Sequence, residues 1–341
     1  MWRKLLVLIA YVYPVALAAL LLLLYGVGES WWVTTALLYI PRALLLVPLP
    51  LLVLALLVAG ERRLLWTQLA ALLLCVFPLM GFVLPGAGSA NPEARSLRLL
   101  SLNANSGFFG ATAIVSQVSS YHPDIVLIQE GQFGGGQIAE GLRALYPHVH
   151  ASTQFTVASR FPILEATDPA RIPYYNRERS PRFMRYLIQT PLGAIAFYSL
   201  HPISPRGALH VHRFRDVLHQ LRTGAFLEGD PEADLGGNTG LRALQIAAAA
   251  DLASRERVSV ILAGDTNLPG LSNILRNNLG RYQDGFRAGA SGFGYTFPAK
   301  RPFLRLDRIM SGAGFRFTSF DIGCHGVSDH LCVVADIQRD P

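Results

Sequence analysis

The feature that most constrains this chain is an uncharged apolar run over residues 5–25. A helix rises 1.5 Å per residue, so such a run is about 30 Å long and can cross a bilayer. It is too long for a simple signal peptide and has no cleavage site. Two further apolar runs follow, over residues 43–59 and 64–84, the first interrupted by Pro48 and Pro50. We therefore expect about three transmembrane helices within residues 1–87.

Charge in this region is sparse and unevenly placed. Its charged side chains are Arg3, Lys4, Glu29, Arg42, Glu61, Arg62 and Arg63. Because basic residues stay in the cytoplasm, their positions predict an N-terminus inside, three spans and a remainder of the chain outside. Arg42, at the head of the second run, departs from this pattern. If the second run were only re-entrant, two spans would leave the remainder in the cytosol.

The rest of the chain has the composition of a soluble domain. Gly, Pro and Ser gather in residues 88–96, which we interpret as a linker to a globular domain over residues 97–341. The formal net charge of the whole chain is +7, and the globular part with its linker carries 25 basic against 21 acidic residues, or +4. This mild surplus fits an anionic substrate or lipid surface without requiring nucleic acid. The cysteines show no zinc spacing. A bridge between Cys324 and Cys332 is one alternative, but strand geometry often turns such pairs apart, and we expect free thiols.

Short apolar runs in the globular part end on polar residues. The runs "LRLLSLN", "DIVLIQE", "GAIAFYSLH" and "VSVILAGDTN" predict strands, and residues 239–254 predict a helix with Thr239 as its N-cap. The polar residues at the strand ends are Asn103, Glu130, His201, Asp265 and Asn267. In layered α/β folds such ends converge on a ligand.

This set of side chains has a chemical meaning. Carboxylate and amide oxygens without a cysteine cluster favour a hard cation such as Mg²⁺ or Mn²⁺. Histidine beside aspartate suits activation of water and stabilisation of a phosphoryl transition state. The sequence contains no G-x-S-x-G, P-loop or H-E-x-x-H motif. The pattern therefore favours metal-assisted hydrolysis of a phosphoester.

An ordered series of motifs carries a family resemblance. "SLNAN", "IVLIQE", "YSLH", "LAGDTN", "RLDRIM" and "VSDHLCVV", supported by "VASRFPI" and "GYTFP", occur in this order over residues 97–336. The series resembles the endonuclease/exonuclease/phosphatase superfamily, which includes deoxyribonuclease I. The resemblance implies a four-layer α/β/β/α sandwich, here preceded by transmembrane helices, as in a membrane-anchored bacterial member of the superfamily.

The resemblance also implies a metal site. Glu130 is expected to be the principal ligand of Mg²⁺ or Mn²⁺, and Asn103 to complete or orient the metal site. Asp329 is expected to lie near the metal.

The remaining motif positions imply catalytic roles. Asp265 is expected to align or deprotonate the attacking water, and Asn267 to hold a phosphate oxygen. His330, oriented by Asp307, is expected to contact the phosphate, and His201 to bind the phosphate or serve the leaving group.

These features predict a membrane-anchored, divalent-metal-dependent phosphoesterase in the bacterial inner membrane, with its catalytic domain outside the cytoplasm. A tether helps only a substrate at the membrane, which favours a phospholipid or polyprenyl phosphate. The expected partners are the bilayer and this substrate, without an obligate protein partner. The alternatives are an exported nuclease and a degenerate binding domain. An arginine-rich stretch, residues 170–185, is either a solvated loop or a contact for anionic headgroups.

Overall fold

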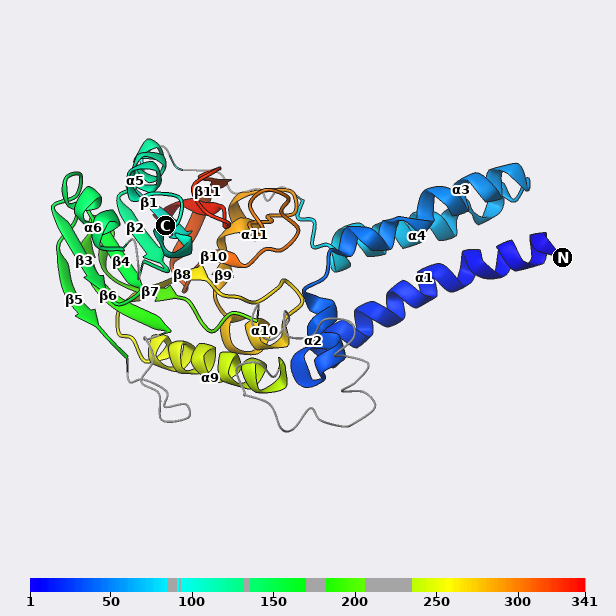
Figure 1. Cartoon of the computed structure of the whole chain (residues 1–341), viewed down its shortest axis with the longest axis horizontal. Helices are drawn as coiled ribbons and strands as arrows, with labels where there is room; N and C mark the ends of the chain where they lie inside the picture. The colour runs from blue at the N-terminus through cyan, green and yellow to red at the C-terminus, as the bar shows by residue number, and fades with distance from the viewer. Residues whose placement is uncertain (85–90, 92, 132–134, 170–181, 206–234, 341) are drawn as a thin grey trace.

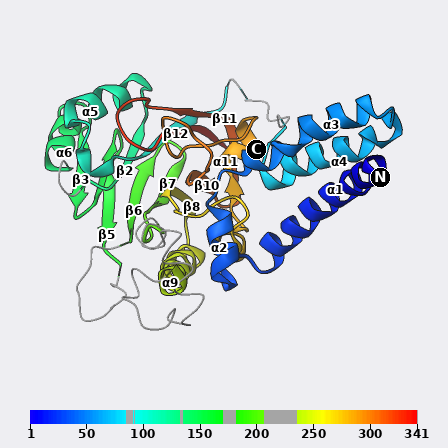
Figure 2. The same cartoon turned by 45° about the vertical axis from the view of Figure 1, so that its right-hand side comes forward.

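The computed structural model describes residues 1–84, 91, 93–131, 135–169, 182–205 and 235–340. Two six-stranded sheets pack face to face, and helices cover their outer faces (Figures 1 and 2). The expected four-layer α/β/β/α sandwich is confirmed.

Both sheets are mixed. In sheet order, the first contains β11 (Phe315–Gly323), β12 (Cys332–Arg339), β1 (Ser96–Asn103), β2 (Ile125–Gln129), β4 (Phe155–Ser159) and β3 (His148–Ser152). The second contains β5 (Ile163–Thr167), β6 (Phe183–Thr190), β7 (Gly193–Leu200), β8 (Ser259–Asp265), β10 (Asp307–Ser311) and β9 (Gln283–Asp284). The pairs β1–β2 and β7–β8 are parallel, and the other neighbours are antiparallel.

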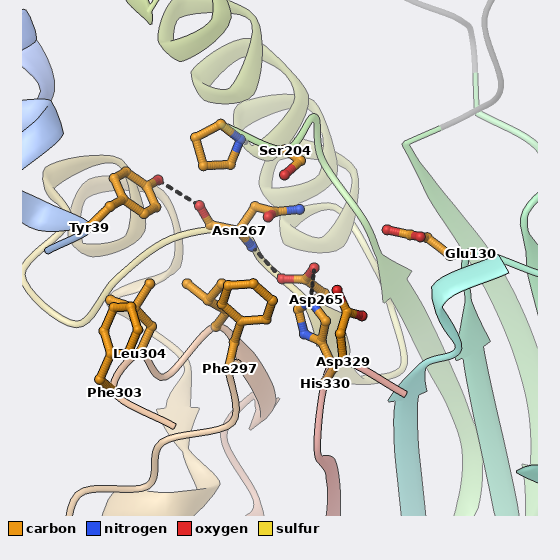
Figure 3. A pocket seen from close by; sticks show the side chains of 12 residues that line it. Tyr39, Glu130, Ser204, Asp265, Asn267, Phe297, Phe303, Leu304, Asp329 and His330 are labelled. Carbon is orange, nitrogen blue, oxygen red and sulfur yellow. Dashed lines mark hydrogen bonds and ion pairs between the residues drawn. The ribbon is translucent and has the colours of Figure 1, made fainter. Parts of the chain in front are cut away.

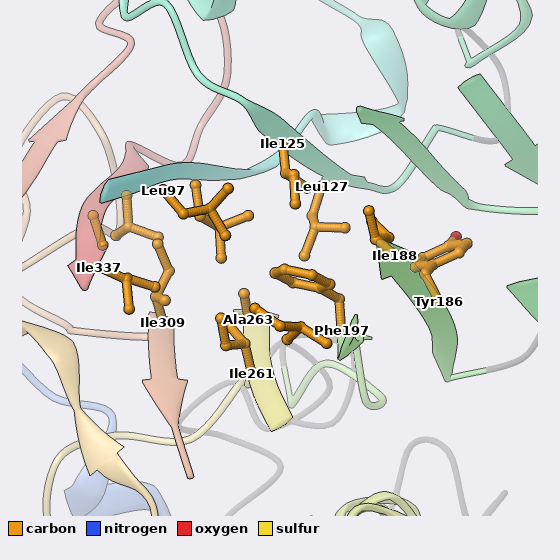
Figure 4. Close-up of a cluster of buried hydrophobic side chains, with 14 of the residues drawn as sticks. Leu97, Ile125, Leu127, Tyr186, Ile188, Phe197, Ile261, Ala263, Ile309 and Ile337 are labelled. Carbon is orange, nitrogen blue, oxygen red and sulfur yellow. The ribbon is translucent and has the colours of Figure 1, made fainter. Parts of the chain in front are cut away.

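The strands carry apolar side chains on both faces, because one face of each sheet packs against the other sheet and the opposite face packs under helices. In β1, Leu97 and Leu99 enter the core between the sheets, whereas Leu100 and Leu102 pack under the outer helices. Strands β2 and β8 alternate in the same way, and their inward side chains meet those of the opposite sheet in Figure 4. This alternation decides which strand-end side chains face the space between the sheets.

Two pairs of helices form the outer layers. Helices α5 (Ala111–Ser120) and α6 (Gly135–Arg143) cover the first sheet, and α9 (Leu235–Ser254) and α10 (Asn273–Leu279) cover the second. The short α11 (Gly285–Gly289) packs against β11.

The predicted start of α9 at Thr239 is wrong. The helix already includes Leu235, which is buried, and Asn238, whose Nδ2 donates to the Ser204 carbonyl. These tertiary contacts outweigh the low helix propensity of the intervening glycines.

The N-terminal region forms a group of helices on one side of the sandwich (Figure 1). They are α1 (Trp2–Gly26), α2 (Trp32–Leu38), a 3₁₀ helix (Arg42–Leu46), α3 (Pro48–Val58) and α4 (Leu65–Leu74), which continues as a π-helical turn (Cys75–Leu79). The N-terminus and the α3–α4 turn lie at the end farthest from the sandwich (Figure 1).

Among the described residues, two helices are long and apolar enough to cross a membrane, Trp2–Gly26 and Arg62–Leu79. The pair Trp32–Leu38 and Arg42–Val58, bent by 86°, gives a third if it forms one span. The bend lies at residues 39–41, before the predicted run over residues 43–59. That run consists of the 3₁₀ helix and α3, and its prolines lie in the first turn of α3.

These helices also contact the sandwich. Leu17 and Leu24 of α1 belong to one buried cluster with Leu304 and Leu306, which precede β10. Apolar surface therefore continues from the N-terminal helices to the sandwich.

The expectation of free thiols at Cys324 and Cys332 is wrong. The two residues form a disulfide, with their Cα atoms 5.4 Å apart. Gly323, not Cys324, is the register partner of Cys332, and Cys324 has a φ of +58°. This left-handed residue leaves the pleat of β11, so the alternation that turns strand side chains apart no longer applies to it.

Candidate active site

Strand alternation brings four of the predicted side chains to one end of the sandwich. Asn103 and Asp265 occupy inward-facing positions at the ends of β1 and β8, and His201 follows β7 in the same phase. Asp307 opens β10 and is the register partner of Asp265. Because β1 and β8 each end here and β10 begins here, these side chains meet between the sheets.

Asn103 connects the two sheets at this point. Its Nδ2 donates to Glu130 Oε1 and to Asp265 Oδ2, both at 3.1 Å. Glu130, directly after β2, has a φ of +53°, a left-handed conformation that is unusual for a residue with a side chain. Strained backbone of this kind is typical of functional sites.

His201 lies beside both carboxylates. Its Nδ1 is 2.5 Å from Gln154 Oε1, which leaves Nε2 to face Glu130 Oε1 at 3.2 Å and Asp265 Oδ2 at 3.8 Å. Burial opposes ionisation of Glu130, but hydrogen bonds from His201 and Asn103 and the His201 charge outweigh it and lower its pKa to about 2. Glu130 is therefore anionic at neutral pH.

His330 is fixed between two aspartates. Its Nδ1 is 2.9 Å from Asp307 Oδ2, and its Nε2 is 3.7 Å from Asp265 Oδ2. Burial alone would lower the pKa of His330, but the negative charges of Asp307 and Asp265 raise it to about 10. Burial also raises the pKa of Asp265, with a further contribution from Asp307 that His330 opposes.

Asn267 turns the chain after β8. It has a φ of +50°, and its backbone N–H donates to Asp265 Oδ1 at 2.8 Å. Its Nδ2 donates to the Pro202 carbonyl, and its own carbonyl accepts from the Tyr39 hydroxyl. This network fixes Asn267 at the edge of the site. Its expected contact with a phosphate oxygen stays a prediction.

The loop that carries Asp329 and His330 is fixed by Ser328. The Ser328 hydroxyl donates to the Asn103 carbonyl at 2.6 Å and accepts from the His330 backbone N–H at 3.1 Å. The Cys324–Cys332 disulfide closes the same loop.

A cavity of about 400 Å³ opens onto these groups. Figure 3 shows Glu130 on one side and Asp265, Asp329 and His330 on another. Of the eight predicted site residues, five line the cavity: Glu130, Asp265, Asn267, Asp329 and His330. The other three, Asn103, His201 and Asp307, contact these residues from behind. Glu130 and Asp329 thus share one cavity, as the motif series implied.

The donor set fits a hard divalent cation. Oxygen ligands from separate strands surround one cavity, and such clustered carboxylates need a compensating positive charge. Asp265, Asp307 and His330 offer ligand atoms that lie within 4.8 Å of one another. This set differs from the predicted metal-site residues Asn103, Glu130 and Asp329, but both sets meet at the same end of the sandwich.

The sequence alone did not identify several supporting residues. Gln154 and Ser328 orient His201 and the loop of His330, and Tyr39 lines the cavity from the N-terminal region. Arg242 is fully buried on α9 and donates to the Tyr39 hydroxyl at 2.9 Å. Of these, only Ser328 had a sequence signal, since it belongs to the "VSDHL" stretch.

Most of the arginine-rich stretch, residues 170–181, lies outside the described residues. Within its described end, Arg185 forms ion pairs with Glu256 at 2.5 Å and Glu165 at 2.7 Å. Arg185 is therefore a structural residue of β6.

The endonuclease/exonuclease/phosphatase family model matches residues 100–330 of this chain. No curated protein gives a match. Among solved structures, SmcL is 14% identical over 72% of this chain and 99% of its own, with a TM-score of 0.52. TDP2 from Caenorhabditis elegans is 14% identical over 72% and 74%, with a TM-score of 0.50. An endonuclease/exonuclease/phosphatase from Beutenbergia cavernae is 20% identical over 72% of both chains, with a TM-score of 0.46.

At these identities SmcL and TDP2, with TM-scores of 0.52 and 0.50, support the fold alone. The family model spans most of the chain and shows the family to which the chain belongs. Members of this family act on phosphate ester bonds and generally depend on a divalent metal. The chain belongs to the endonuclease/exonuclease/phosphatase family and is a phosphoesterase.

Proposed function

We propose that this protein is a membrane-anchored phosphoesterase that uses Mg²⁺ or Mn²⁺ to hydrolyse a lipid-linked phosphate ester, such as a phospholipid or a polyprenyl phosphate. The observation that carries the proposal is the two-sided lining of the catalytic cavity. One side holds the carboxylates and His330, and the other is apolar and continuous with the N-terminal helices.

The apolar side is well defined. Its side chains are Tyr39, Phe297, Phe303, Leu304 and Leu306. All five belong to, or pack against, the cluster that includes residues of α1 and α4. If the phosphate of a lipid substrate lay beside the carboxylates, the hydrocarbon chain attached to it would lie along this apolar wall. Each buried methylene contributes about 0.8 kcal/mol, so a few of them favour a lipid over a short ester strongly.

The positions of basic residues in the N-terminal helices support a membrane anchor that places the catalytic domain outside the cytoplasm. Arg3 and Lys4 lie at the start of α1, and Arg62 and Arg63 lie at the α3–α4 turn, both at the end away from the sandwich (Figure 1). Basic residues on the cytoplasmic side would place the sandwich outside, with three spans of the bacterial inner membrane. The Cys324–Cys332 disulfide agrees with an oxidising compartment. A C-terminal fusion to a reporter enzyme that folds only after export should be active, and an inactive fusion would reverse the topology.

The metal would be held by Glu130 and Asp329, with Asn103 orienting Glu130. When bound, it would neutralise charge that develops on the phosphate. Asp265, beside both histidines, is positioned to align the attacking water and accept its proton. His330 would donate to a phosphate oxygen from Nε2 while Asp307 holds Nδ1.

His201 lies behind Glu130 and Asp265. It would bind the phosphate or serve the leaving group through Nε2, since Gln154 occupies Nδ1. Asn267 would hold a further phosphate oxygen.

The test uses purified full-length protein in detergent. Lipid phosphates, a chromogenic phosphodiester and plasmid DNA are each incubated with Mg²⁺, Mn²⁺ or chelator, and Glu130→Gln and His330→Ala serve as inactive controls. We expect metal-dependent turnover of a lipid phosphate. Plasmid nicking without lipid turnover would instead identify an exported nuclease.

The apolar wall has its own test. Phe303→Ala should raise KM for the lipid substrate about tenfold, the equivalent of one or two buried methylenes, and leave KM for the short chromogenic ester unchanged. Leu164→Ala, an exposed position on β5, is the matched control. An equal effect on both substrates would remove the lipid-tail argument.

A further inference from the structure

A second cavity, of about 370 Å³, lies where the N-terminal helices meet the sandwich. Tyr25 at the end of α1 and Leu79 after α4 line one part of it, and Tyr295 of the sandwich lines another. It shares the wall residues Phe303 and Leu304 with the catalytic cavity but none of the carboxylates there. It is therefore a separate site with a different chemistry.

Three arginines line this second cavity: Arg42, Arg287 and Arg305. Arg42 donates from its two terminal nitrogens to the carbonyls of Leu79 at 2.7 Å and Leu38 at 3.0 Å. Its Nε is buried and has no hydrogen-bond partner in the part of the chain that the structure describes. No carboxylate among those residues forms an ion pair with Arg42, so its charge is balanced only by carbonyl dipoles.

Arg305 shares its carboxylate partner with an arginine outside the cavity lining. Asp284 forms ion pairs with Arg305 at 3.2 Å and with the buried Arg308 at 3.0 Å. Arg287 is exposed, and within the described ranges its side chain has no carboxylate in ion-pair contact. The cavity therefore carries a surplus of positive charge, which an anion would neutralise.

The remaining lining combines apolar and amphipathic side chains. Leu21, Leu22 and Phe77 supply apolar surface from the N-terminal helices. Tyr25 and Tyr295 are amphipathic rings of the kind found at headgroup depth. Guanidinium groups at that depth with hydrocarbon below fit a phosphate that carries acyl chains.

We propose that this cavity binds the headgroup phosphate of an anionic phospholipid from the leaflet next to the catalytic domain, with its acyl chains along α1 and α4. The inference rests on the membrane insertion proposed above but not on the catalytic reaction. It also gives Arg42, the base that departs from the charge pattern of the spans, a role at the outer interface.

The test measures lipid-dependent stability of the full-length protein in detergent with chelator, so that no lipid is hydrolysed. Phosphatidylglycerol and phosphatidylcholine with the same acyl chains are compared by the shift in Tm. At a lipid concentration about 100-fold above Kd, we expect phosphatidylglycerol to raise Tm by roughly 5 °C and phosphatidylcholine to raise it by much less.

Substitutions of single arginines test whether the lipid-induced shift in Tm comes from binding in this cavity. Arg287→Gln should lose at least half of the phosphatidylglycerol shift, and Arg42→Gln should lose more. Arg281→Gln removes an exposed arginine that does not line the cavity and should keep the full shift. Because Arg42 also holds backbone carbonyls, the exposed Arg287 decides the test if the Arg42 variant does not fold.

An equal shift with both lipids, or an undiminished phosphatidylglycerol shift in Arg287→Gln, would overturn the inference. Turnover of the chromogenic phosphodiester is measured in parallel. Loss of lipid selectivity with normal turnover would reject only the lipid site, and selective binding without turnover would reject only the proposed function.

Discussion

The contact between Asp307 and His330 allows a quantitative test of the site. Asp307 Oδ2 lies 2.9 Å from His330 Nδ1, and the two residues are 2% and 4% exposed. This contact fixes the ring so that Nε2 faces the cavity and Asp265. Asp307→Asn keeps the size of the side chain but removes its charge.

A hydrogen bond to a charged group contributes about 1.5–3 kcal/mol, and each 1.36 kcal/mol is a factor of ten in rate. We therefore expect Asp307→Asn to lower kcat about 10- to 200-fold. KM should change little if His330 acts mainly in the transition state. The variant should also lose activity at a lower pH than the wild type, because the Asp307 charge is one reason why the pKa of His330 is raised.

The assay is steady-state hydrolysis of a chromogenic phosphodiester by the full-length protein, at a fixed metal concentration over a range of pH. Asp321→Asn, the same substitution at an exposed position of β11, is the control. A folded Asp307→Asn variant with kcat within twofold of wild type would refute the role of this pair.

Three further results are expected. The pKa of Asp336 is lowered, because its hydrogen bonds with Arg98 and Ser319 outweigh burial, so this carboxylate stabilises the fold at neutral pH and loses that effect as pH falls below about 4. Asp336→Asn should thus lower Tm at pH 7, and by progressively less as the pH is lowered below about 4. Reducing the Cys324–Cys332 disulfide should destabilise the protein by about 2.5 kcal/mol from loop-closure entropy, measured by denaturant unfolding with and without reductant. Glu130→Gln should weaken Mn²⁺ binding at least tenfold in calorimetry, and unchanged affinity would exclude Glu130 as a ligand.

Much of the site could be predicted because its residues sit in local patterns. The period of two along β1 and β8 places Asn103 and Asp265 in phase with inward-facing leucine, isoleucine and alanine side chains, so their direction follows from the sequence. The family motifs then relate these ends to Glu130 and to the His330 loop. The alternation of apolar strands and helices indicates a layered α/β fold, and the family resemblance implies the four-layer sandwich.

Other features depend on contacts that no local pattern encodes. Tyr39 donates to the Asn267 carbonyl across 228 residues of sequence, and only the docking of the N-terminal helices onto the sandwich creates this contact. The Cys324–Cys332 bridge depends on one left-handed residue that takes Cys324 out of its strand.

The sequence by itself determined that this chain has an apolar N-terminal region and a phosphoesterase domain with a metal-suited set of side chains. Only the tertiary structure decided that Tyr39 of the apolar region joins sandwich side chains in the apolar wall of the catalytic cavity. It also decided that a second cavity, lined by three arginines, lies where the two parts of the chain meet. The physical reason is that helix and strand periodicity are set by neighbouring residues. How two such units pack, and which distant side chains they bring together, depends on the shape and charge of both surfaces.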